Sequence, residues 1–221
     1  MEINSHGTDL VPFTQSFRAE SIVNTAKKPF IEANTDEVSL SFLKTRCTIP
    51  VFTKDNETTL SHQEFIDSAF SVISSVFPNE IIEGPEIRVS HEIKGRTPDA
   101  LGIPVKDLQE HQKTTYYERM AFIIRIPSIT ETINGNTLAL TIGGVRAYNL
   151  ENLYNKKTYE KFKFFIGFQN MVCCNLCVST DGFMSELKAM SFMDLEDKML
   201  QLITSYNISR HLSSMEQLTN Y

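Results

Sequence analysis

The strongest constraint on the fold is a hairpin signal in the middle of the chain. Two apolar stretches rich in β-branched residues, 118–133 and 136–142, flank the pair Asn134–Gly135. Asparagine and glycine tolerate the positive φ angles of a tight turn, so two adjacent antiparallel strands are predicted here. Pro127 has no backbone N–H group and therefore predicts a sheet edge or a β-bulge within the first strand.

Other stretches of alternating polarity predict further strands. They cover residues 38–53, 86–94 and 162–179, and the second strand of the hairpin is expected to continue to residue 145. Because these strands are joined by short turns, we expect a mostly antiparallel sheet.

Two helices are predicted to cover this sheet. Ser61 and Glu64 have the spacing of a capping box, and apolar residues follow at helical intervals over 61–77. A second broad apolar stripe predicts a helix over residues 185–205. The fold class expected from the sequence is therefore α+β, a mostly antiparallel sheet with covering helices.

The remaining segments define the expected domain limits. Residues 1–37 are polar without a sustained period and predict a loose N-terminal arm, followed by a single α+β domain over residues 38–205. Residues 98–115 predict an exposed insertion with a short helix near residues 105–111. Residues 206–221 have helical composition but no stop signal, so we expect a C-terminal helical segment that is cut short.

Charge and hydropathy restrict the class of protein. The formal net charge of −6 argues against a chain that coats nucleic acid by its overall field, although a local patch remains compatible with it. No apolar run is long enough for a membrane span and no signal peptide is recognisable. We expect a cytoplasmic protein that does not bind membranes and keeps its four cysteines as free thiols.

One segment stands out as a candidate surface. Residues 146–163 combine lysines with tyrosines, a composition typical of phosphate contact and base stacking. An ordinary exposed connection, with lysine stems lying on aromatic rings, has the same composition. The candidate contact residues for nucleic acid or a partner are Arg146, Tyr148, Asn149, Asn152, Tyr154, Lys156, Lys157, Lys161, Lys163 and, beyond this segment, Asn175.

We interpret the cluster of Cys173, Cys174 and Cys177 as structural thiols without a metal-binding or redox role. Cys174 and Cys177 form a C-x-x-C pair, but strand alternation over residues 171–179 would point their sulfur atoms to opposite faces. A composite site that includes Cys47 or His91 stays open. We expect no catalytic residue, no metal ligand and no cofactor, and oligomeric state cannot be predicted.

Several stretches carry a resemblance to a known family. PFIEANT, IPVFTKDNETTLSHQEFI, PEIRVSHEIKGRTP, YYERMAFIIRIPSI and DLEDKML, together with residues 145–182, resemble an uncharacterised bacterial family with a domain of unknown function. The likeness covers about residues 29–205 and implies proteins carried on conjugative and phage-like mobile elements. FQNMVCCNLCVSTDG is also similar to a segment of phage and plasmid proteins, matched by Cys173 and Asn175. The resemblance implies no catalytic or binding residue.

These observations lead to one functional hypothesis and two alternatives. The hypothesis is a non-enzymatic accessory protein of a mobile element that contacts nucleic acid or a nucleoprotein partner. A protein-interaction or anti-host module is the first alternative, and an enzyme of unfamiliar type is the second.

Overall fold

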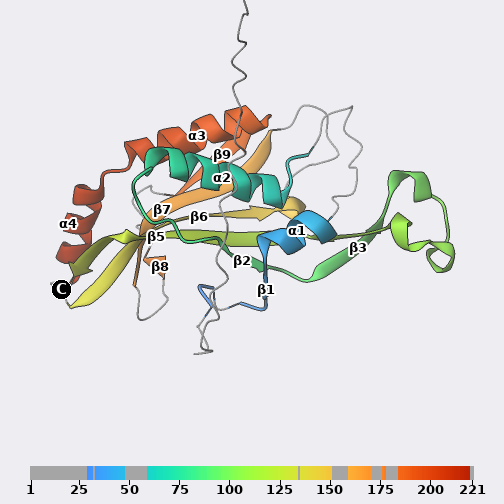
Figure 1. Ribbon diagram of the computed structural model, residues 1–221, viewed down its shortest axis with the longest axis horizontal. Helices are drawn as coiled ribbons and strands as arrows, with labels where there is room; N and C mark the ends of the chain where they lie inside the picture. The colour runs from blue at the N-terminus through green and yellow to red at the C-terminus, as the bar shows by residue number, and fades with distance from the viewer. Residues whose placement is uncertain are drawn as a thin grey trace, which may run out of the picture.

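The computed structural model describes residues 29–31, 33–47, 59–133, 135–150, 159–170, 176–177 and 184–219. Within these ranges, seven strands form one antiparallel sheet in the order β1-β2-β5-β6-β7-β8, and β9 also pairs with β7 (Figure 1). Helices α2 and α3 cover one face of this sheet, which confirms the expected α+β class. The bounds are β1 (Asp36–Val38), β2 (Glu86–Val89), β5 (Arg119–Ile133), β6 (Asn136–Ala147), β7 (Glu160–Asn170), β8 (Leu176–Cys177), β9 (Met184–Ala189), α2 (His62–Val76) and α3 (Phe192–Ser205).

The predicted hairpin is confirmed as β5 and β6, which pair along nearly their whole length. Gly135 has a φ of 76°, the left-handed conformation that a tight hairpin turn requires. The register shifts between Ile126 and Thr130, so Pro127 lies at an irregularity of the β-bulge type. On its other side β5 pairs with β2 only over Met120–Ile123, so Pro127 also lies beyond that ladder, where β2 does not cover this side of β5.

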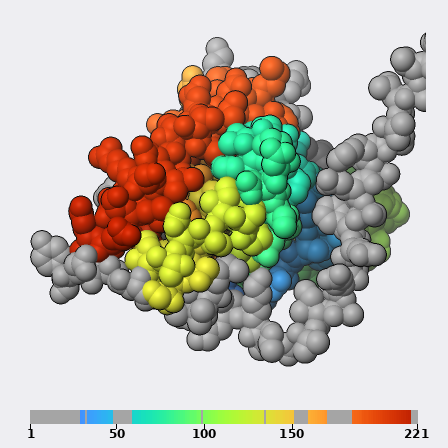
Figure 2. All heavy atoms as spheres, turned by 60° about the vertical axis from the view of Figure 1, so that its left-hand side comes forward, coloured from blue at the N-terminus to red at the C-terminus, as the bar shows by residue number. Residues whose placement is uncertain are grey.

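The main core lies between the sheet and its covering helices. Side chains from one face of the sheet, among them Phe122 and Phe164, pack against Phe65 of α2 and Leu195 of α3. Figure 2 shows α2, α3 and the tip of the β5–β6 hairpin together on one side of the molecule. The predicted C-terminal helix is present as α4 (Ile208–Thr219), which adds partly buried apolar side chains to the same core.

The opposite face of the sheet carries a smaller apolar cluster. Phe30, from the segment before β1, packs against Ala121 and Ile123 of β5 and Phe165 of β7. This cluster covers the middle of that face, so the far ends of the strands are the places where its side chains can reach solvent.

Of the strand expected over residues 38–53, Val38 lies at the end of β1, but residues 40–46 are helical and the prediction is wrong there. Residues Leu40–Arg46 form helix α1, because the Ser39 hydroxyl accepts a hydrogen bond from the Phe42 amide (3.1 Å) and caps the helix. Helical spacing lets α1 bury Leu43 against the core, a contact that the alternation of 38–42 does not reveal. Residues 48–53 lie outside the described residues.

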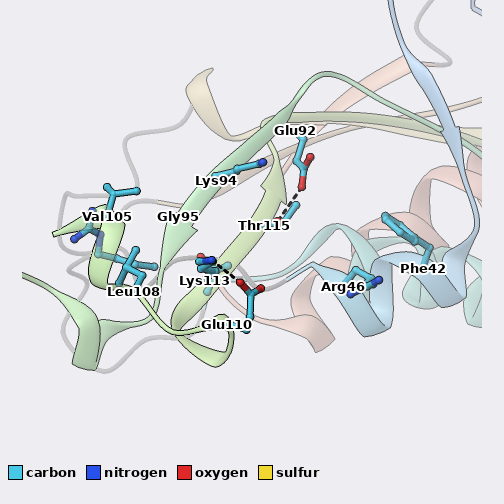
Figure 3. Close-up of a pocket in the computed structure, with 12 residues that line it drawn as sticks. Phe42, Arg46, Glu92, Lys94, Gly95, Val105, Leu108, Glu110, Lys113 and Thr115 are labelled. Carbon is cyan, nitrogen blue, oxygen red and sulfur yellow. Dashed lines mark hydrogen bonds and ion pairs between the residues drawn. The ribbon is translucent and has the colours of Figure 1, made fainter. Parts of the chain in front are cut away.

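The strand expected over residues 86–94 is divided into two. β2 ends at Val89, and β3 (Glu92–Arg96) pairs with β4 (Lys113–Tyr117) in a separate two-stranded sheet (Figure 3). The expected insertion therefore contains a strand at its end. In place of the short helix near 105–111 it has 3₁₀ turns, Pro98–Ala100, Val105–Asp107 and Glu110–Gln112.

The helix expected over residues 185–205 is shorter than predicted and begins at Phe192. The first part of the expected range is strand β9, in which Leu187 and Ala189 alternate onto the core face. Helix α3 begins only after Ser191, whose side chain accepts from the Asp194 amide (3.2 Å). Of the strand expected over 171–179, the described residues include only β8, which pairs with β7.

Gly143 is predicted to be intolerant of any side chain. A Cβ atom there would lie 2.3 Å from the Phe122 carbonyl oxygen, a backbone atom that cannot move aside without disturbing β5. Gly143→Ala is therefore expected to lower the free energy of unfolding by about 1–3 kcal/mol in urea denaturation. Gly84→Ala is the matched control, because a Cβ at Gly84 meets nothing within 4 Å. Equal stability of the two variants would contradict this account of the close strand packing.

Candidate nucleic-acid interface

The predicted contact residues separate into three groups. Arg146 and Tyr148 are buried, with 1% and 4% of their surface exposed, so their assignment to a contact surface is wrong. Asn149, Lys161 and Lys163 are exposed. The others lie outside the described residues; they are Asn152, Tyr154, Lys156, Lys157 and Asn175.

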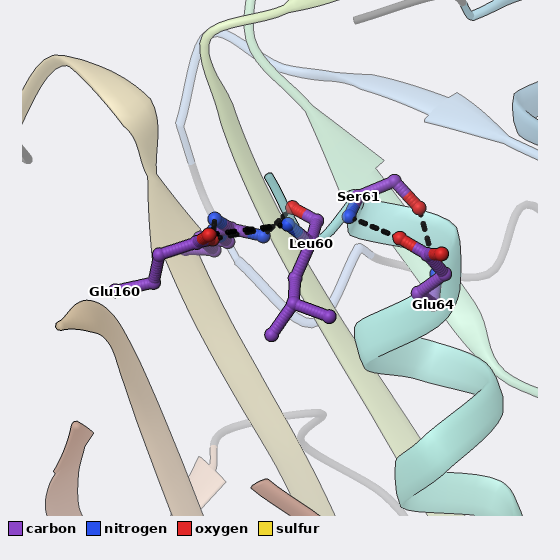
Figure 4. A network of polar contacts seen from close by, with 5 residues as sticks. Leu60, Ser61, Glu64 and Glu160 are labelled. Atoms are coloured by element: carbon purple, nitrogen blue, oxygen red, sulfur yellow. Dashed lines mark hydrogen bonds and ion pairs between the residues drawn. The ribbon is translucent and has the colours of Figure 1, made fainter. Parts of the chain in front are cut away.

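Arg146 is a core residue that fastens the start of α2 to the sheet. Its guanidinium donates to the Leu60 carbonyl oxygen and forms an ion pair with Glu160, whose carboxylate accepts from the Leu60 amide (3.2 and 3.3 Å; Figure 4). The guanidinium also lies 4.3 Å from the Phe162 ring centroid and 4.6 Å from that of Tyr148. Both backbone groups of the residue before the helix cap are thus bonded to one buried ion pair.

The capping box completes this attachment. The Ser61 side chain accepts from the Glu64 amide (3.1 Å), and the Glu64 carboxylate accepts from the Ser61 amide (2.6 Å; Figure 4). The predicted box is therefore confirmed, and it stands directly beside the Arg146–Glu160 pair.

His62 extends the buried cluster and is held neutral. Its ring stacks on Tyr148 at 4.3 Å between centroids, and its Nε2 donates to the Tyr117 carbonyl oxygen (2.8 Å), since a carbonyl can only accept. Burial, and then the charge of Arg146, lower the pKa of His62 to about 3 despite the Tyr117 bond. Nδ1 has no hydrogen-bond partner within the described part of the chain, so a protonated ring would bury an unpaired donor.

Within the described part of the chain, neither Cys47 nor His91 belongs to a cluster of metal-ligating side chains, and the composite site stays a hypothesis. Burial, and then the Glu92 carboxylate, raise the pKa of the Cys47 thiol to about 11, so it is not a thiolate near neutral pH. His91 is exposed between β2 and β3. In the described ranges, no three His, Cys, Asp or Glu side chains gather as metal ligands would.

Exposed cations gather at one end of the open sheet face. Lys161 and Lys163 alternate with the buried Phe162 and Phe164 along β7, so both lysines project from the face opposite α2 and α3. Lys188 of β9 stands directly opposite Lys161 in the register, and exposed Arg119 lies on the same face two residues before Ala121. We call Arg119, Lys161, Lys163 and Lys188 the basic face.

One acid lies within the basic face. Glu186 stands opposite Lys163, and its carboxylate is 3.7 Å from the Lys161 ammonium. Both partners of that contact are nearly half exposed, so the ion pair is screened by solvent and contributes little. The four cations and one acid leave this end of the sheet positive in a chain whose formal net charge is −6.

The cation farther along the same face is engaged within the protein. Arg125 donates to both carboxylate oxygens of Glu86 (2.5 and 2.9 Å) and to Gln169 (2.7 Å), and is 6% exposed. Arg125 therefore adds little accessible positive charge to this face.

The structure defines an α+β protein with a helix-covered sheet and an extended β3–β4 hairpin. The chain belongs to the family described as domain of unknown function, B. Theta gene description (DUF3871), whose model matches residues 14–221. This confirms the resemblance to an uncharacterised family, whereas the association with mobile elements stays a prediction. No curated protein and no solved structure was found to match the chain. Among the described helices, none is long and apolar enough to cross a membrane.

Proposed function

We propose that this protein is a non-enzymatic, cytoplasmic accessory protein of a mobile genetic element, and that it contacts nucleic acid through the basic face. The link to mobile elements rests on the family resemblance of the sequence. The location of the contact rests on the sheet, where the exposed lysines project from rigid strands.

The observation that carries the proposal is the pairing of Lys161 with Lys188. Like charges directly opposite each other on neighbouring strands are destabilising, and here the half-exposed Glu186 gives weak compensation. A phosphate group placed between the two ammonium groups would relieve this repulsion. Counterion release from the phosphate backbone would favour the same contact.

The protonation states of His62 and Cys47 support a role without catalysis. His62 stays neutral down to about pH 3 and the Cys47 thiol stays protonated up to about pH 11. Near neutral pH, neither group is poised to exchange a proton or to act as a thiolate nucleophile.

A binding assay with matched charge variants tests the proposal. Fluorescence anisotropy at low ionic strength should show binding of labelled DNA. The triple variant Lys161→Gln, Lys163→Gln, Lys188→Gln should weaken it by at least about tenfold, because three phosphate contacts are lost. The control Lys106→Gln, Lys198→Gln, Arg210→Gln removes the same charge from the 3₁₀ helix Val105–Asp107 and from the helices α3 and α4, and it should leave binding nearly unchanged.

Two results would argue against the proposed contact. If both triple variants weaken binding equally, the effect depends on net charge and not on the basic face. If neither DNA nor RNA binds at low ionic strength, the proposed function is wrong. Capture of a specific protein at high salt, with no binding of nucleic acid, would instead favour a protein-interaction module.

A further inference from the structure

A groove between α1 and the β3–β4 hairpin has the properties of a ligand site. Its volume is about 660 Å³, within the usual range for small-ligand pockets. Figure 3 shows Phe42 and Arg46 of α1 at one end and Val105 and Leu108 of the 3₁₀ turns at the other, with the hairpin between them. The groove is thus assembled from three segments that are far apart in the sequence.

Three contacts hold the walls of the groove in place. A β-bridge joins Cys47, directly after α1, to Thr115 of β4. Lys44 pairs with Asp67 of α2 (2.8 Å), and the Arg96 guanidinium donates to the Ile103 carbonyl oxygen near the hairpin tip. Because both walls are fastened in this way, a ligand would meet a preformed site.

The lining is positive, and two of its cations form no ion pair within the described residues. Four cationic and two carboxylate side chains line the groove. Glu110 pairs with Lys113 (2.5 Å), and Glu92 accepts from Thr115 (2.9 Å). Neither Arg46 nor Lys94 forms an ion pair with any residue that the structure describes.

An exposed aromatic ring lies beside Arg46 on α1. Phe42 is 39% exposed and precedes Arg46 by four residues, so both side chains lie on the same side of α1, about 5–6 Å apart at Cβ. The Leu43 side chain next to it is buried and anchors the helix. An apolar ring next to a cation is the combination that binds a nucleobase together with its phosphate.

We propose that this groove binds one unpaired nucleotide, with its base against Phe42 and its phosphate on Arg46 and Lys94. The base must be unpaired, because both faces of a base within a duplex are covered by its stacked neighbours. The nucleotide can belong to a single strand or be a free mononucleotide. The single-strand form rests on the proposed function, whereas the free form does not.

Three probes and a matched pair of variants test the proposal. The probes are a labelled oligothymidylate, a labelled DNA duplex and free dTMP, the last followed by calorimetry. Phe42→Ala should weaken binding of the oligothymidylate by about tenfold, the size of one base-stacking contact, and leave the duplex unaffected. Phe192→Ala is the control, because Phe192 on α3 is also 39% exposed and does not line the groove.

The outcomes separate the source of the nucleotide from the proposal itself. Selective loss of oligothymidylate binding in Phe42→Ala supports a single strand, and Phe42-dependent binding of dTMP alone supports a free nucleotide. In either case Arg46→Gln with Lys94→Gln should weaken the same probe. If Phe42→Ala and Phe192→Ala behave alike with all three probes, the groove proposal is overturned, even where the basic-face lysines still control DNA binding.

Discussion

Replacing Arg146 by methionine is expected to lower the free energy of unfolding by about 3–5 kcal/mol, the range for breaking a buried ion pair by removing one partner. The variant removes the guanidinium that pairs with the Glu160 carboxylate, which is 6% exposed. It also leaves the Leu60 carbonyl oxygen without the guanidinium donor. The N-terminus of α2 would then lose its attachment to β6.

Two further arginine variants isolate this effect. Arg146→Lys keeps the charge but loses the two-pronged donor geometry, so its stability should fall between those of wild type and Arg146→Met. Arg119→Met removes an exposed arginine from the neighbouring strand and should change stability by less than about 0.5 kcal/mol. Urea denaturation followed by circular dichroism measures all three. A loss below about 1 kcal/mol for Arg146→Met would contradict the role assigned to the buried pair.

Acidification is expected to destabilise the protein through His62. The pKa of this histidine is lowered from its ordinary value of 6.5 to about 3 in the folded state, so between these values the unfolded chain binds more protons. Stability contributed by the neutral ring is therefore fully present above about pH 6.5 and decreases as pH falls. The slope attributable to one such group is about 1.4 kcal/mol per pH unit, or about 3 kcal/mol over two units.

Two histidine variants test whether His62 causes this dependence of stability on pH. His62→Gln keeps a donor for the Tyr117 carbonyl oxygen but cannot be protonated, so the fall in unfolding free energy from pH 6 to pH 4 should become shallower. His91→Gln, at an exposed position, should retain the wild-type slope. Urea titrations at several pH values give the comparison. Parallel curves for wild type and His62→Gln would show that His62 is not the group responsible.

The elements that the sequence predicts correctly are those with a local signal. The β5–β6 hairpin follows from Asn134–Gly135, and α2 follows from the Ser61–Glu64 capping box. Where residues 38–42 alternate in polarity, the Ser39 cap and the burial of Leu43 give a helix instead. The strand β9 was missed because its pairing partner, β7, is distant in sequence and outweighs the helical composition of residues 185–190.

The same distinction explains the outcome for the candidate site. Lys161 and Lys163 were chosen for the basic composition of residues 146–163, and they are exposed because they alternate with the buried Phe162 and Phe164 along β7. The same rule, applied from the apolar Ile142 through Gly144, would have put Arg146 on the core face, but its basic neighbours suggested a surface role. The position of Lys188 opposite Lys161 depends on strand register, which no local pattern specifies.

The groove could not be predicted from the sequence. Its lining comes from α1, whose residues were expected to form a strand, and from a hairpin whose second strand was expected to be part of a linker. Phe42 and Lys94 come to line one groove only through the bridge between Cys47 and Thr115 and the pairing of β3 with β4.

The salt dependence of DNA binding tests the central claim most directly. Each phosphate contact contributes about 0.9 to the slope of log K against log salt concentration for a duplex. The variant Lys161→Gln, Lys163→Gln, Lys188→Gln should therefore reduce the slope by about 3, while the helix-surface control keeps the wild-type slope. Identical slopes for wild type and the basic-face variant would contradict the assignment of this surface to nucleic acid.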